Sequence, residues 1–165
     1  MRVLAVDPGY DRIGFAILEK GVHDRKEALL HSECLVTNRS DMFENRLLAA
    51  GQAMERLVGA FSPQYCALEK LYFVSNQKTA MGVSEARGVF LYTAARHGLT
   101  LFEYTPLQIK NAVTGNGRSG KQQVIDMVHK LISLETKKRH DDEYDAIAIG
   151  ITCLASEQNN AVVKH

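Results

Sequence analysis

The sequence predicts an α/β or α+β domain built on a mixed β-sheet. Three expected strands come first, a helix follows, and then strands alternate with helices. A length of 165 residues suits one compact domain with a single core. No internal repeat or linker divides the chain. We therefore expect one domain over residues 1–156, followed by a polar tail over residues 157–165.

The expected strands are short apolar segments bounded by turn residues. The first two flank the turn Asp7-Pro8-Gly9-Tyr10 and should form a hairpin. The five strands are expected over residues 2–6, 12–19, 27–36, 65–68 and 99–104.

Helices are expected where apolar residues recur at helical intervals. Gly98 closes the longest of them. The helices should begin near residue 41, cover 76–97, begin at 105, run from 119 to about 132, and cover 141–155. Three of their starts carry residue pairs with capping-box spacing, namely Asp41 with Glu44, Thr105 with Gln108, and Ser119 with Gln122.

Composition excludes several classes of protein. No apolar run approaches the roughly 18 residues needed to span a bilayer, and the start of the chain is too short and too soon acidic for a signal peptide. Cys34, Cys66 and Cys153 form no C-x-x-C pair, which argues against a zinc or redox motif and fits a reducing compartment. We therefore expect a cytoplasmic protein with no membrane partner.

Basic residues gather in the last third of the chain. The net charge of +1 does not by itself indicate a nucleic-acid-binding protein. Such a cluster fits either a DNA-contacting surface or an ordinary solvated helical face. Its members are Lys110, Arg118, Lys121, Lys130, Lys137, Lys138, Arg139 and His140.

Four acidic residues lie at the ends of hydrophobic elements. Asp7 ends the first expected strand and Glu69 follows the fourth, while Asp142 and Asp145 share one face of the last helix. Carboxylates at the edge of a core are costly unless they are neutralised. Mg²⁺ favours oxygen ligands shared with phosphates, and two such ions about 4 Å apart can drive phosphodiester hydrolysis.

Each acid also has a purely structural explanation. Asp7 before Pro8-Gly9 can be a turn-former, Asp141 and Asp142 can cap the last helix, and Glu69 can pair with a lysine. Singly, these explanations are as good as the functional one. Four acids at element ends together favour a metal site, and spacing alone does not decide between the two.

Several segments, in order and over nearly the whole chain, resemble RuvC-type Holliday junction resolvases. The opening Asp-x-Gly recurs across ribonuclease-H-like proteins, whereas the full set is specific. The segments are Val6-Asp7-Pro8-Gly9 with Gly14 and Ala16, and residues 67–73, 84–89, 102–106, 115–118 and 142–148.

This resemblance implies a ribonuclease-H-like fold, with a mixed five-stranded sheet flanked by helices. It implies a homodimer that resolves four-way DNA junctions by paired symmetric nicks in recombination and repair, together with a branch-migration helicase partner. It also implies two Mg²⁺ ions, or Mn²⁺ in their place. Their ligands would be Asp7, Glu69, Asp142 and Asp145. Asp141 beside Asp142 leaves the register of the ligands open, and the spacing to Asp145 favours Asp142.

The resemblance further implies contacts with DNA. A lysine near the cleavage site can hold the scissile phosphate or offset charge that develops in the transition state, and we assign this catalytic role to Lys121. An exposed aromatic ring can stack on an unpaired base. The alternatives are surface lysines and core packing of an aromatic ring. The expected DNA-binding residues are Tyr72, Phe73, Arg87, Lys110 and Arg118.

The helix over residues 76–97 is the candidate dimer interface, because it is more apolar than one face requires. The alternative is that it is buried within the monomer. Its apolar residues are Ala80, Met81, Val83, Val89, Phe90, Leu91 and Tyr92.

Three other functions compete with junction resolution. A ribonuclease-H-like enzyme that processes ribosomal RNA precursors should lack the segments 69–73 and 115–121. A pure junction-binding protein gains nothing from carboxylates that face phosphates. An actin-like nucleotide-binding domain needs two halves, for which this chain is too short.

Overall fold

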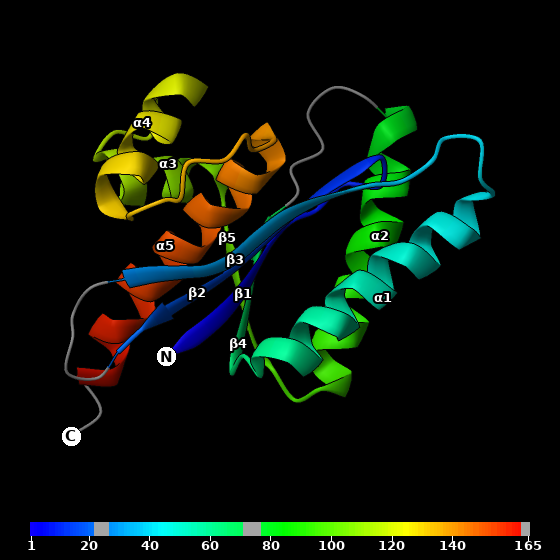
Figure 1. Ribbon diagram of the computed structural model, residues 1–165, viewed down its shortest axis with the longest axis horizontal. Coiled ribbons are helices and arrows are strands. Elements are labelled where there is room, and N and C mark those ends of the chain that lie inside the picture. The colour runs from blue at the N-terminus through cyan, green and yellow to red at the C-terminus, as the bar shows by residue number, and fades with distance from the viewer. Residues whose placement is uncertain (22–26, 71–76, 163–165) are drawn as a thin grey trace.

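A five-stranded mixed sheet forms the centre of the computed structural model, which describes residues 1–21, 27–70 and 77–162 (Figure 1). The strand order is β3-β2-β1-β4-β5, with β1 antiparallel to β2, β2 antiparallel to β3, and β4 parallel to both β1 and β5. The expected hairpin and mixed sheet are confirmed. The strands are β1 (Arg2–Asp7), β2 (Arg12–Lys20), β3 (Glu27–Val36), β4 (Tyr65–Glu69) and β5 (Thr100–Tyr104).

Helices cover both faces of this sheet (Figure 1). On one face lie α1 (Phe43–Phe61) and α2 (Gln77–Arg96). On the other lie α3 (Pro106–Thr114), α4 (Lys121–Leu131) and α5 (Asp141–Val162). Within the described residues, no helix has both the length and the apolar character that a membrane span requires.

The alternation of side chains along the strands creates two cores. On β1, Leu4 and Val6 pack toward α1 and α2, whereas Val3 and Ala5 pack toward α5. All four side chains are fully buried. The central strand is therefore apolar on both faces, and its first polar side chain after residue 2 is Asp7, at the edge of the sheet.

Two expected helix starts were wrong by one or two residues. Helix α1 begins at Phe43 without a side-chain cap, because Asp41 instead accepts a 3.1 Å hydrogen bond from the amide of Asn38 in the preceding turn. Helix α4 begins at Lys121, so the side chain that accepts the N–H of Gly120 is Gln123, at 2.9 Å. The capping box at the start of α3 is confirmed.

Ser119, which was expected to cap α4, has another role. Ser119 is buried, and its hydroxyl hydrogen-bonds that of Thr114 at 2.8 Å, which closes the loop between α3 and α4. The last helix was expected to end at Ala155, but α5 continues to Val162. No Gly or Pro stands between these two residues to interrupt it.

Candidate active site

Asp7 and Glu69 meet because their strands are parallel neighbours. Val6 pairs with Leu68 in the β1–β4 ladder, so the residues that follow them end the two strands side by side. Burial raises the pKa of Asp7 well above its ordinary value, and the negative charges of Asp145, Glu69 and Asp142 raise it further. The two strand ends and the last helix therefore bring four carboxylates into one electrostatic cluster.

A glycine lets the start of α5 reach this edge. Gly14 pairs with Asp7 across the β1–β2 hairpin. A Cβ atom at Gly14 would stand 1.9 Å from the backbone oxygen of Asp142 and 3.3 Å from the Cβ of Ala146. Because glycine has no side chain, the first turn of α5 lies directly on β2. Asp142 and Asp145 are thereby carried to the end of β1.

Asp142 and its neighbour Asp141 differ in exposure. The side chain of Asp142 is 18% exposed, whereas that of Asp141 is 63% exposed. The charge of Asp142 also helps to raise the pKa of Asp7. The helix therefore turns Asp142 inward and Asp141 outward.

Cations partly neutralise the cluster. The ammonium of Lys121 lies 3.1 Å from Asp145 and 3.4 Å from Asp141. Partial burial acts to lower the pKa of Lys121, but its hydrogen bond to Asp145 and the charges of both acids outweigh this effect and raise it. Arg12, at the start of β2, places its Nε atom 3.3 Å from Asp142.

The pKa values of the other acids show that this neutralisation is incomplete. Burial and the charge of Asp145 raise the pKa of Glu69, against the opposing charge of Lys110. Burial also raises the pKa of Asp145, and Lys121 only partly offsets it. Burial therefore makes these carboxylates costly to ionise, and the neighbouring lysines offset only part of that cost.

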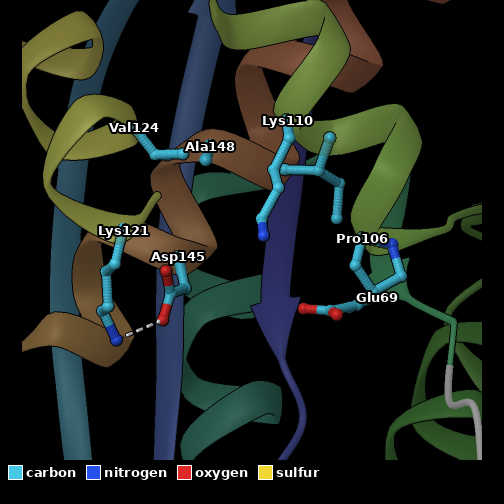
Figure 2. A pocket seen from close by; sticks show the side chains of 8 residues that line it. Glu69, Pro106, Lys110, Lys121, Val124, Asp145 and Ala148 are labelled. Carbon is cyan, nitrogen blue, oxygen red and sulfur yellow. Dashed lines mark hydrogen bonds and ion pairs between the residues drawn. The ribbon is translucent and has the colours of Figure 1, made fainter. Parts of the chain in front are cut away.

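A pocket of about 230 Å³ opens beside the cluster (Figure 2). Lys110 of α3 and Glu69 stand on one side of it, and the ion pair of Lys121 with Asp145 stands on the other (Figure 2). Its remaining lining is formed by Pro106, Ile109, Val124 and Ala148. Two lysines and two acids of the cluster thus line the same pocket.

The donor set suits a hard divalent cation, because all four side chains offer only carboxylate oxygens. No group of three or more His, Cys, Asp or Glu side chains stands ready as a metal cage among the described residues. Asp142 is paired with Arg12, and Asp145 with Lys121. A metal ion bound by these carboxylates would replace Arg12 and Lys121 as their partners.

The residues expected to contact DNA fall into three groups. Arg118 is exposed in the loop before α4, where its backbone N–H donates to Asn116. Arg87 is in α2, half-buried, and paired with Glu103 of β5. Tyr72 and Phe73 lie outside the described residues.

Sequence reasoning missed two charged residues beside the site. Arg12 carries no motif that links it to Asp142, and the two meet only because α5 packs on β2. Glu143 looked like one more acid in the first turn of a helix. Its side chain is in fact buried: burial acts to raise its pKa, but hydrogen bonds from Ser32 and Lys137 outweigh this and lower it.

Comparison with known proteins gives a family match over almost the whole chain. Residues 3–153 match the family model described as crossover junction endodeoxyribonuclease RuvC. The protein of that name from Thermosipho melanesiensis is 40% identical, over 95% of this chain and 98% of its own length. The one from Finegoldia magna is 39% identical, over 92% of this chain and 91% of its own.

A solved structure matches equally broadly. Thermus thermophilus RuvC in complex with a Holliday junction substrate superposes with a TM-score of 0.87 and 28% identity. The match covers 96% of each chain. The overall fold described above is therefore shared with that structure.

Proposed function

The chain belongs to the RuvC family of crossover junction endodeoxyribonucleases, and on this premise we propose that it resolves four-way DNA junctions by hydrolysing phosphodiester bonds at the acidic cluster. The ribonuclease-H-like fold expected from the sequence is confirmed by the match to RuvC. The observation that carries the proposal is the convergence of four carboxylates, from two strands and one helix, beside two lysines. The matched RuvC structure holds a Holliday junction substrate.

We infer that the enzyme depends on Mg²⁺, with Mn²⁺ as a substitute, and that Asp7, Glu69, Asp142 and Asp145 hold two ions. When bound, such ions supply an activated water and stabilise the leaving oxygen. The burial of Asp7 and its repulsion by the neighbouring acids support this inference, because buried carboxylates are costly without a counter-charge. Asp7 is the central ligand in this proposal, because the charges of all three other acids raise its pKa.

The lysines are assigned to the DNA strand. Lys110 and Lys121 flank the pocket from opposite sides, where a phosphate between them would meet both charges. Lys121 can leave Asp145 for a phosphate once that carboxylate is otherwise neutralised. Arg118 is exposed in the loop that leads to Lys121 and suits a contact to the DNA backbone. Arg87 could contact DNA only by exchanging Glu103 for a phosphate.

We further propose that the working enzyme is a homodimer, because one acidic cluster serves one scissile phosphate and resolution needs two cuts. Helix α2 remains the candidate interface. Its residues Ala86 and Phe90 are buried in the monomer, whereas Met81 and Tyr92 are 69% and 66% exposed. The buried residues pack within the monomer, and the exposed ones are available for the proposed interface. A helicase partner, and base stacking by Tyr72 and Phe73, rest on the family resemblance alone.

The decisive experiment incubates the protein with a synthetic four-way junction, a linear duplex and a structured RNA, each with and without Mg²⁺. We expect paired nicks in the junction only, and only with the metal. Asp7→Asn should bind the junction without cutting it. Preferential cutting of the RNA would indicate an RNA-processing nuclease, and junction binding without any cleavage would indicate a pure binding protein.

A further inference from the structure

Glu143 is the least exposed acidic residue among those that the structure describes, with 4% of its surface exposed. It stands between Asp142 and Asp145 in the sequence. A helix turns about 100° per residue, however, so its side chain points away from the active-site pocket and toward β3. A buried charge of this kind needs partners. The partners of Glu143 come from β3 and from the loop before α5, and none of them lines the active-site pocket.

The first set of partners joins α5 to the middle of β3. The hydroxyl of Ser32, itself buried, donates to Glu143 at 2.8 Å. Lys137 lies 3.2 Å from the same carboxylate oxygen and also donates to the backbone oxygen of Ser32 at 2.9 Å. The guanidinium of Arg139, whose side chain is 3% exposed, lies 4.0 Å away. Two basic residues of the loop before α5 are thus bound inward.

The second partner marks where the helix begins. The backbone N–H of His140, just before α5, donates to the other oxygen of Glu143 at 3.3 Å. An acidic side chain at the third helical position that binds back to the preceding residue is one half of a capping box. If α5 shifted its register against the sheet by one residue, Asp142 and Asp145 would rotate by about 100° and leave the cluster.

We propose that Glu143 is the positioning residue of the active site, which holds the first turn of α5 against β3 so that Asp142 and Asp145 face Asp7. The proposal rests on the proposed function, since these acids are its metal ligands. Gly14 lets the same turn press on β2, so the turn is held from two strands at once.

The test compares variants of the full-length protein for metal affinity as well as for cleavage. Residues that orient metal ligands typically change metal affinity or activity by about 10–100-fold. Glu143→Ala should therefore weaken the binding of Mn²⁺ alone by about 10-fold or more, measured by calorimetry on the free protein. It should also slow single-turnover junction cleavage at fixed Mg²⁺, while junction affinity without metal stays unchanged.

Two milder variants keep the test valid if Glu143→Ala does not fold. Glu143→Gln keeps an acceptor for His140 but loses the charge, and Ser32→Ala loses the link to β3, so both should fall between the wild type and Glu143→Ala. Ile17→Val, in the core on the opposite face of the sheet, is the control for a general loss of stability. It should leave Mn²⁺ affinity unaltered.

Wild-type Mn²⁺ affinity in both Glu143→Gln and Ser32→Ala would overturn the positioning role. So would an effect no larger than that of Ile17→Val. A wild-type protein that does not cut junctions would instead refute the proposed function, and the Mn²⁺ affinities would then decide the role of Glu143 on their own.

Discussion

Replacing Gly14 with alanine tests whether the acidic cluster depends on direct contact between α5 and β2. The added methyl carbon would stand 1.9 Å from the backbone oxygen of Asp142, and ordinary van der Waals contact starts only at 3.4 Å. The first turn of α5 must therefore move by about 1.5 Å relative to β2. Because the obstacle is backbone, no rotation of a side chain relieves it.

This displacement acts on activity more than on stability. Overpacking typically costs about 1–3 kcal/mol, and each kcal/mol lowers the melting temperature of a chain of this size by about 2–4 °C. A misplacement of about 1 Å in an active site can reduce the rate 10²-fold. Asp142 and Asp145 move with the turn while Asp7 and Glu69 do not, so we expect a cleavage rate reduced by about 100-fold or more.

Two other glycines provide matched controls. A Cβ at Gly150, farther along α5, would meet only the flexible end of Leu18 at 2.2 Å, so Gly150→Ala should lower stability and leave the cluster in place. A Cβ at Gly59 in α1 would meet nothing within 4 Å, so Gly59→Ala should stabilise by about 0.4–1 kcal/mol.

The assay is single-turnover cleavage of a labelled four-way junction, with thermal melting and junction binding measured on the same samples. Gly14→Ala should lose cleavage and keep binding, because affinity comes mainly from phosphate contacts by Lys and Arg. Near-normal cleavage by Gly14→Ala, or an equal loss in Gly150→Ala of similar stability, would refute the reasoning.

The other predictions concern single groups of the site. Asp142→Asn should reduce cleavage by more than about 100-fold, because replacing a metal ligand should cost more than replacing a residue that only orients one. Asp141→Asn should be far milder, because Asp141 is exposed. The reverse order of rates would show that Asp141, and not Asp142, is the ligand. Lys121→Ala should slow single-turnover cleavage of bound junction without changing affinity, and the opposite pattern would remove its catalytic role. Burial and nearby acids raise the pKa of Asp7 in the folded, metal-free chain above its value in the unfolded chain. Between these two pKa values the folded chain holds a proton that the unfolded chain releases, so stability falls as pH rises through this range. Asp7→Asn should therefore melt higher than the wild type at neutral pH without metal, gain less from Mg²⁺, and lose its advantage in acid; equal melting curves would contradict this. A mixed dimer with one Asp7→Asn subunit should nick one strand of a junction, and complete resolution by it on a gel would contradict the paired-site proposal.

The sequence by itself determined the elements and the identity of the acids. Apolar runs broken by turn residues are local signals, and they predicted the five strands to within one or two residues. Asp7 and Glu69 stood out because a carboxylate at the end of an apolar strand is unusual on physical grounds. The spacing of Asp142 and Asp145 indicated a shared face, since about 3.6 residues per turn is fixed by the helix itself.

Only the tertiary structure decided which side chains stand around these acids. Glu143 lay in the same acidic run as Asp142, yet it is buried against Ser32, which is 111 positions away in the sequence. The basic residues before the last helix fitted either a DNA-contacting surface or a solvated helical face, but Lys137 and Arg139 pair with the buried Glu143. Contacts of this kind depend on strand order and on where a helix settles across a sheet. Those are set by packing of the whole core, and no local pattern of residues records them.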